Sequence, residues 1–402
     1  MIRLTYRGFA RLASIAGVTL ALAAPPALAG IKLITLPPRE RVEIHLEHRG
    51  VTLVEEERTV PLTAGVNDVV FAWANTSIDR SSIQLRPLSS PAPDGKGVQV
   101  LSVSYPPGEN ALTWQVASEK AGPARVRISY LIGRLDKSFA YRAETTRDEK
   151  TLTLWQYILL HNAANEEFGT AGMWPGFGER IERPIGVNET RKILTARYTD
   201  VPVRKTYTAD LAHHGYLEAA KKQLRIPMHY VLQNDLSHGL GDSPLRFGKA
   251  RIFQQDGHGG AAFLGEDWAA FTPRDDELKL FLGVSRDIVV KRTIDKREEI
   301  RRTGNLRDYD VVIKYEIENF KDSAADLDIV ESMSALRREI LGNTGRDVEW
   351  ETLGKASLNG KLDPERTTAD EVVAQLTLPP RGADQQATKQ TFTLHIRIKN
   401  EW

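Results

Sequence analysis

Residues that could do chemistry are most concentrated in GKARIFQQDGHGGAAFLGEDWAAFTP, positions 248 to 273. Asp256, His258, Glu266 and Asp267 lie there within a dozen positions, among five glycines. Imidazole and carboxylate groups of this kind bind metal ions or transfer protons. A metal site needs three or four ligands that converge on one point, whereas the tip of this stretch supplies one imidazole and one carboxylate.

The local pattern favours a β-hairpin over a metal-binding or catalytic loop. The segments KARIFQQ and AAFLG are typical of short strands, and DGHGG between them contains Asp-Gly, a signal of a tight turn. Gly257, Gly259 and Gly260 supply the positive φ angles that such turns need. We therefore predict that His258 lies at an exposed hairpin tip and that the stretch is structural.

A second group of polar residues lies just before this hairpin. His238 and Asp242 are four residues apart in HGLGDSPLRFG (238 to 248), a Gly-rich stretch that we interpret as the hinge into a C-terminal domain. We predict no catalytic, cofactor-binding or metal-binding residue. The candidate surface site comprises His238, Asp242, Asp256, His258, Glu266 and Asp267.

Carboxylates leave one enzymatic alternative open, an envelope glycan hydrolase that uses acids between residues 238 and 267. A glycosidase needs two carboxyl groups roughly 5 to 9 Å apart across a cleft. Three other acid pairs, in EEE (55 to 57), DYD (308 to 310) and DLD (326 to 328), could share a strand face. Solvated strand faces carry such acids routinely, so these pairs do not decide between the alternatives.

Alternation of apolar and polar residues with a period of two dominates the chain and predicts β-strands. YDVVIKYEIEN (309 to 319) and TFTLHIRIK (391 to 399) are the clearest cases. Similar runs recur about every dozen residues, separated by turn clusters such as PAPDGKG and PPGEN. We expect an all-β protein with antiparallel β-sandwich domains in tandem and at most one or two short helices.

Two segments depart from this simple alternation. TLTLWQYILL (151 to 160) is apolar on both faces, so we place it centrally between layers. TADLAHHGYLEAAKKQ (208 to 223) has helix character, with Asp210 as its expected N-cap.

Residues 1–29 predict a cleaved signal peptide. The segment has a basic start with three arginines, an apolar run from Leu12 to Ala24, and a small-residue ending at Ala29. Pro25-Pro26 end the apolar run short of the roughly 20 residues that a membrane-spanning helix needs. We expect cleavage after Ala29 and a periplasmic mature chain without a transmembrane helix.

Composition argues against several other classes of partner. The chain has 54 basic and 53 acidic residues, and removal of the three signal-peptide arginines leaves 51 against 53, a net charge of −2. Nucleic-acid-binding proteins normally carry a basic stripe, which is not visible here. The chain has no cysteine, which excludes disulfides and thiolate metal sites. We expect no nucleic acid and no cofactor, and the oligomeric state stays open.

Three domains are expected after the signal peptide. They are an N-terminal β-domain over 30–123, a middle β-domain over 124–247 and a C-terminal β-sandwich domain over 248–402.

The chain ends in TFTLHIRIKNEW, with Trp402 in phase with the apolar face, as in the last strand of an outer-membrane β-barrel. The other strands are too short and too charged for lipid, so the barrel is the less favoured alternative and we expect Trp402 to pack at a domain edge.

The order of segments resembles the exported mucoidy-inhibitor-like bacterial family, whose function is unknown. The resemblance begins at GVTLVEEERTVPLTAGVNDVVFAW and IDRSSIQLRP and continues through SYLIGRLDKSFAYRAE and LWQYILLHNAANEEF. It is clearest at GKARIFQQDGHGGAAFLGED, DIVVKRTI, YDVVIKYEIENFKD and FTLHIRIKNEW. The resemblance implies an N-terminal β-domain followed by a larger β-sandwich region, without established catalytic residues. Relatives often carry a long coiled-coil insertion, whereas residues 97 to 130 here have the pattern of strands and turns.

These observations lead to one functional expectation. Well-patterned strands without a convergent set of reactive side chains predict a non-catalytic protein that binds or scaffolds an envelope component. The partner would be an envelope protein or a glycan, bound at sheet edges or at the loops of one sandwich end.

Overall fold

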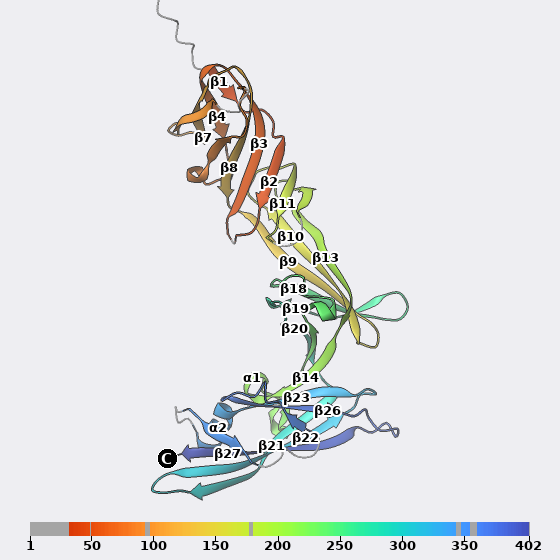
Figure 1. Cartoon of the computed structure of the whole chain (residues 1–402). Helices are drawn as coiled ribbons and strands as arrows, with labels where there is room; N and C mark the ends of the chain where they lie inside the picture. The colour runs from red at the N-terminus through yellow and green to blue at the C-terminus, as the bar shows by residue number, and fades with distance from the viewer. Residues whose placement is uncertain are drawn as a thin grey trace, which may run out of the picture. The chain divides into compact units, whose positions relative to one another are not determined.

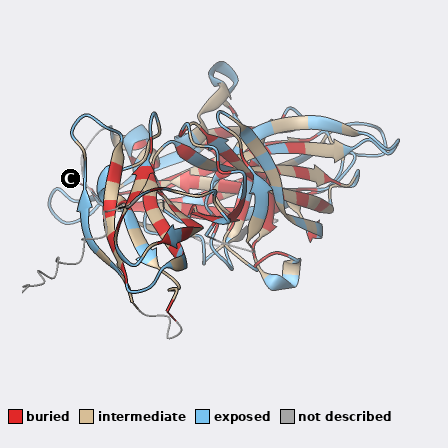
Figure 2. Ribbon diagram, turned by 90° about the horizontal axis from the view of Figure 1, so that it is seen from above, coloured by how far each residue is buried: buried red, intermediate tan, exposed pale blue. Residues whose placement is uncertain are grey.

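The computed structural model describes residues 32–48, 50–92, 97–176, 180–342, 347–353 and 360–401. The expected signal peptide and Trp402 lie outside these residues. The chain is all-β, as expected from its period-two alternation, and buried and exposed residues alternate along its strands (Figure 2). In the part of the chain that is described, the α-helices are α1 (Leu211–His214) and α2 (Met333–Leu341), and the 3₁₀ turns are η1 (Arg80–Ser82), η2 (Ala219–Lys221) and η3 (Leu236–His238).

Two compact units make up the fold. The first contains the described residues of 1–42, 55–75 and 80–130, and the second those of 43–54, 76–79 and 131–402. Neither unit follows the expected domain ranges 30–123, 124–247 and 248–402, which remain predictions. No helix among the described residues has both the length and the apolar character needed to cross a membrane.

The first unit contains a complete four-stranded sheet. Its order is β1-β4-β7-β6, with strands β1 (Lys32–Thr35), β4 (Gly65–Ala72), β6 (Val98–Ser104) and β7 (Ala111–Ser118). Aromatic rings fill the core of this unit, where Phe71 lies 6.0 Å from Trp114 and 5.8 Å from Tyr130 between ring centroids. Burial of these large rings adds to the apolar area of this core, to which aliphatic residues such as Val69, Leu112 and Ile128 also contribute.

A six-stranded sheet has the order β12-β11-β2-β3-β8-β5. Its strands are β2 (Arg41–His45), β3 (Thr52–Leu62), β5 (Gln84–Pro87), β8 (Gly122–Ile132), β11 (Thr170–Trp174) and β12 (Ile181–Pro184). In the first unit, the buried carboxylate of Glu56 is paired with Arg39 and Arg58, as a buried charge must be. In the second unit, β11 runs parallel to the end of β2.

The middle sheet, in the second unit, has five strands in the order β13-β10-β9-β18-β19 (Figure 1). Its strands are β9 (Leu135–Thr145), β10 (Thr151–Asn162), β13 (Thr190–Pro202), β18 (Gly248–Gln255) and β19 (Ala261–Ala269). Strands β18 and β19 form the hairpin predicted from DGHGG. Strand β18 also runs parallel to β9, so sheet pairing crosses position 248, where the C-terminal domain was expected to begin.

Two six-stranded sheets form the C-terminal sandwich. One has the order β20-β17-β14-β23-β26-β25, with strands β14 (Arg204–Asp210), β17 (Pro227–Gln233), β20 (Glu277–Val284), β23 (Ala325–Ser332), β25 (Gly360–Leu362) and β26 (Glu371–Leu378). The other has the order β15-β16-β21-β22-β27-β24, with strands β15 (Tyr216–Glu218), β16 (Gln223–Leu224), β21 (Ile288–Arg301), β22 (Arg307–Asn319), β24 (Glu349–Thr352) and β27 (Thr388–Glu401).

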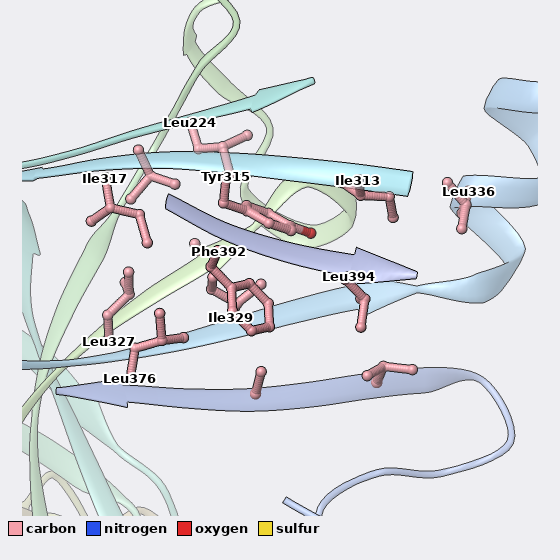
Figure 3. Close-up of a cluster of buried hydrophobic side chains, with 14 of the residues drawn as sticks. Leu224, Ile313, Tyr315, Ile317, Leu327, Ile329, Leu336, Leu376, Phe392 and Leu394 are labelled. Atoms are coloured by element: carbon pink, nitrogen blue, oxygen red, sulfur yellow. The ribbon is translucent and has the colours of Figure 1, made fainter. Parts of the chain in front are cut away.

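One continuous apolar core joins the two sheets of the sandwich (Figure 3). Tyr315 of β22 and Phe392 of β27 meet at 5.9 Å between ring centroids, and Leu327 and Leu376 face them from the other sheet. Leu336 of α2 closes one end of this core. The alternation predicted for YDVVIKYEIEN and TFTLHIRIK is therefore the inner face of β22 and β27.

The expected helix over 208 to 223 is mostly wrong. Asp210 is an N-cap as predicted, since its side chain accepts a hydrogen bond from the His213 backbone N–H at 2.9 Å. The helix is only α1, and Gly215 ends it with a φ of 67°. The following residues form β15, η2 and β16, because pairing with the sandwich overrides their helix propensity.

The expected hinge stretch is anchored to the second unit. Asn234 donates to the carbonyl oxygens of Ser243 and Pro273 and accepts from the Gly241 backbone N–H. Leu240 and Leu245 are buried in the core beneath the middle sheet. These contacts hold the loop before β18 in a defined conformation.

Candidate functional site

The hairpin tip contains Asp256 and His258, two of the candidate residues. Asp256 Oδ1 accepts hydrogen bonds from the backbone N–H groups of His258 at 2.7 Å and Gly260 at 3.0 Å. Gly257 and Gly259 have φ angles of 81° and 87°, as the turn requires. The carboxylate thus holds the turn together, and His258 is exposed at the tip as predicted.

His238 and Asp242 do not form the pair considered from their spacing. His238 Nδ1 lies 2.8 Å from both carboxylate oxygens of Asp235, and the Asp235 side chain also caps η3. Hydrogen bonds from Ser237 and His238 lower the pKa of Asp235 to about 2. Asp242 is exposed at the rim of a different cleft, lined by β12 and β13.

Glu266 and Asp267 point to opposite faces of β19. Glu266 contacts Lys249 at 2.7 Å and Arg251 at 3.1 Å, and the hydrogen bond from Lys249 lowers the pKa of its carboxyl. Asp267 Oδ2 instead accepts from the Phe281 backbone N–H at 2.7 Å. The six candidate residues therefore lie on a turn, a loop, a cleft rim and two faces of one strand, and the structure does not bring them together.

Most acids of the other pairs are engaged with arginines, and Asp326 accepts a hydrogen bond from the Thr377 hydroxyl. The ion pairs are Glu55 and Glu57 with Arg127, Asp308 with Arg302, Asp310 with Arg397, and Asp328 with Arg366. Within the residues described, no group of three or more histidine, aspartate or glutamate side chains could hold a metal ion. A different arrangement carries the functional argument.

The middle sheet has one buried and one open face. Inward residues of β9 and β10, such as Tyr141, Ala143 and Leu154, belong to the core. TLTLWQYILL was expected to be apolar on both faces and central. It is buried on one face only, because Trp155, Tyr157 and their neighbours remain half-exposed on the other.

Strand register places basic and aromatic side chains side by side on the open face. Trp155 of β10 lies opposite Arg142 of β9 on one side and Arg197 of β13 on the other. On the next strand, β18, Arg251 lies opposite Arg142. Residues that face each other across neighbouring strands project to the same side of a sheet, so the face extends across these four strands.

An irregularity in β19 adds two exposed aromatic rings. Phe263 lies opposite Phe253 and Trp268 lies opposite Lys249, with a register shift between Ile252 and Phe253. The extra residue in β19 brings Phe263 and Trp268, five positions apart, to the same side of the strand. They are 58% and 56% exposed, which is unusual for rings of this size in a folded domain.

We call this surface the aromatic–basic face. It comprises Arg142, Glu144, Trp155, Tyr157, Lys192, Arg197, Lys249, Arg251, Phe253, Phe263, Glu266 and Trp268. Five of these side chains are basic and two are acidic, a net charge of +3, whereas the whole 402-residue chain carries only +1.

Cationic groups stack directly on the rings of this face. The Arg142 guanidinium carbon lies 4.0 Å from the Phe253 ring centroid and 5.7 Å from that of Trp155. Lys192 Nζ lies 3.9 Å from the Tyr157 centroid, and Lys249 Nζ lies 5.1 Å from that of Trp268. Such contacts hold each cation in place at about 0.5–1 kcal/mol apiece while leaving much of the ring open.

The positive charges on the face act on one another. Partial burial, followed by repulsion from Arg251 and Arg142, lowers the pKa of Lys192. A cation held near other cations is stabilised by an incoming anion. The face can therefore attract a negatively charged partner and pack its apolar parts against flat rings.

This face was not predicted from the sequence, although two of its strands show the alternation of basic or aromatic residues that builds it. Lys249, Arg251 and Phe253 alternate in KARIFQQ, and Trp155 and Tyr157 alternate in TLTLWQYILL. Neither alternation shows that β9 separates these two strands in one sheet. No protein-family model and no curated protein matches the chain, so the geometry of the face carries the functional argument.

Proposed function

We propose that this chain is an exported, non-catalytic binding protein of the bacterial envelope, and that its aromatic–basic face binds a negatively charged glycan. The observation that carries the proposal is the interleaving of five cations with five aromatic rings on one open sheet face. An open face of this kind suits a long polymer ligand better than an enclosed pocket does.

Each half of the surface chemistry matches one half of such a ligand. Carboxylate or phosphate groups of the ligand pair with Arg197, Arg251 and Lys192. The two arginine guanidiniums can each form two parallel hydrogen bonds to such a group. The apolar faces of sugar rings pack on the exposed parts of the Trp155, Phe263 and Trp268 rings, which cations and, at Trp268, the stacked Phe247 ring partly cover. A neutral glycan would use only the rings, and a small anion only the cations.

Catalysis is not part of the proposal. Glu266, the candidate acid on this face, pairs with two cations that hold its carboxyl ionised, which does not suit a general acid. Asp256 is engaged by backbone N–H groups of its turn. A glycan hydrolase that uses acids between 238 and 267 would need a second, protonatable carboxyl facing one of these.

Export is proposed from the sequence. The basic start, apolar run and Ala29 ending of residues 1–29 support a cleaved signal, and the absence of cysteine suits a fold held by its apolar cores. The resemblance to the mucoidy-inhibitor-like family supports the same location and remains a proposal.

Binding to a polyuronate tests the function directly. We expect purified mature protein to bind polygalacturonate much more tightly than dextran of the same length, and to lose polygalacturonate affinity as salt rises because ionic pairs are screened. Trp155→Ala, Trp268→Ala and Arg197→Glu should each weaken binding roughly tenfold, the equivalent of about 1.4 kcal/mol. Tryptophan fluorescence titrations measure the affinity of the native chain and of Arg197→Glu. Affinity gels that contain the polymer measure it for the tryptophan variants.

Matched controls separate the face from general surface effects. Phe320→Ala and Arg301→Glu alter an exposed ring and an exposed cation of the C-terminal sandwich, and both should leave affinity unchanged. Tighter binding of poly(dT) than of polygalacturonate would assign the face to nucleic acid and overturn the proposal. Equal loss in the control variants would also overturn it.

A further inference from the structure

A polar cleft lies on the other side of the middle sheet. It has a volume of about 500 Å³ and is lined by residues of β10, β12 and β13 and by the loop at Asp242 and Ser243. Gln156, the neighbour of Trp155 along β10, faces this cleft because successive strand residues point to opposite sides of a sheet. The two surfaces therefore share a strand but not a side chain.

Gln156 is buried without its full set of hydrogen bonds. The residue is 1% exposed, and its Nε2 donates a long hydrogen bond of 3.4 Å to Thr195 Oγ1. Among the residues that the structure describes, none forms a hydrogen bond with its Oε1. Exchanging the two ends of the amide would leave the NH₂ group without a partner instead, so the deficit holds for either orientation. Burial of an unpartnered amide atom is unfavourable, and a polar ligand in the cleft would relieve it.

Positive and negative side chains line the cleft in equal number. Arg180 and Arg183 are matched by Glu182 and Asp242. Arg180 is further neutralised by Glu43, which its guanidinium contacts at 2.8 Å. A cleft with no excess charge gives no preference to an ionic ligand, in contrast to the aromatic–basic face.

Both donors and acceptors are available to a neutral ligand. Thr195, Tyr198 and Ser243 contribute hydroxyl groups, and Asp242 contributes a carboxylate at the rim. Burial raises the pKa of Tyr198, so its phenol stays protonated and can donate. Ile181 and Ile193 add apolar surface between these polar groups. This mixture of spaced polar groups and aliphatic surface is typical of sites for small polar ligands.

We propose that this cleft binds an uncharged, hydroxyl-rich ligand, a single sugar residue, with the Gln156 amide hydrogen-bonded to it. The sugar is either free or the end of a longer glycan. Asp242 accepts hydrogen bonds from its hydroxyl groups at the rim. The site is independent of glycan binding on the aromatic–basic face, since it uses other residues and the opposite side of the sheet.

Neutral sugars of two lengths test the site. N-acetylglucosamine, and its β-1,4-linked trimer with internal and terminal residues, are titrated by calorimetry and by amide chemical shifts. We expect saturable binding with shifts at Gln156, Thr195 and Asp242. Equal affinity for both would indicate recognition of a terminal or free residue, and tighter binding of the trimer would indicate a glycan end with flanking contacts.

Two variants connect binding to the named groups. Gln156→Met removes the amide while keeping its volume, so affinity should fall at least tenfold while the melting temperature stays the same or rises. Asp242→Asn is an exposed change that leaves folding intact and should weaken binding several-fold. Phe320→Ala, which changes an exposed ring of the C-terminal sandwich, is the control and should leave sugar affinity unchanged.

The proposal has clear contrary outcomes. Absence of saturable binding by both sugars would overturn it, as would unchanged affinity in Gln156→Met or Asp242→Asn. A crystal structure grown with N-acetylglucosamine that shows only an ordered water on the Gln156 amide would also overturn it. A loss of sugar affinity in Phe320→Ala equal to that in Gln156→Met would also overturn it.

Discussion

At the scale of single residues, Arg292 of β21 is a buried charge with several partners. Its guanidinium is buried and donates to Glu331 at 2.8 and 2.7 Å and to Glu339 at 2.9 Å. Tyr315 donates to the same Glu331 carboxylate. Every group in this network has a partner, which is the condition under which buried charges are tolerated.

Removal of one partner should therefore be costly. We expect Arg292→Met to destabilise the protein by about 3–5 kcal/mol, because it leaves the Glu331 carboxylate buried without a counter-charge. The double variant Arg292→Met with Glu331→Leu should recover most of that loss. Urea denaturation followed by circular dichroism measures both, and equal instability of the single and double variants would contradict the explanation.

At the scale of elements, the backbone at the start of β18 lies very close to that of β9. A Cβ added at Gly248 would lie 2.4 Å from the Phe139 carbonyl oxygen and 2.7 Å from its carbon. Backbone atoms cannot move aside as a flexible side chain can, so only glycine allows β18 to pair with β9 here. The parallel pairing that assembles the aromatic–basic face depends on this contact.

Gly248→Ala should separate these strands. We expect a loss of about 1–3 kcal/mol from overpacking, with weaker polygalacturonate binding because β18 carries Lys249 and Arg251. Gly265→Ala in β19 is the control, since its added Cβ would meet only the Leu282 oxygen at 3.5 Å, an ordinary contact. Thermal melts of the two variants provide the comparison, and equal melting temperatures would contradict the close-approach argument.

At the scale of the whole molecule, apolar cores hold an all-β chain that has no cysteine. Two core clusters lie in the second unit, one beneath the middle sheet and one between the sheets of the sandwich. A fold held by apolar cores needs no disulfide oxidation, which is compatible with the proposed export. The proposed location can be tested on the full chain.

Signal processing should determine the mature N-terminus. Expressed from Met1 in a bacterium, the chain should appear in the periplasmic fraction beginning at Gly30, as intact-mass spectrometry would show. Small residues before the cut are what signal peptidase recognises, so Ala27→Arg with Ala29→Arg should leave the chain uncleaved. A native chain that keeps Met1 in the cytoplasm would contradict the export proposal.

Local sequence predicted the class of fold and several details of its turns. Alternation identified β22 and β27, Asp-Gly identified the tip of the β18–β19 hairpin, and Asp210 was recognised as an N-cap. These features succeed because each depends on residues within one turn or one strand. The helix expected after Asp210 fails because strand pairing with the sandwich, a non-local interaction, outweighs helix propensity there.

Local pattern therefore predicts the long alternating strands, such as β22 and β27, and which of their residues share a face. The tertiary structure alone decided which strands are neighbours. Trp155, Arg142 and Arg251 form one surface only because β10, β9 and β18 lie side by side, and Trp268 joins them through an irregularity in β19. Strand order and register are set by pairing between distant segments, so no local period encodes them.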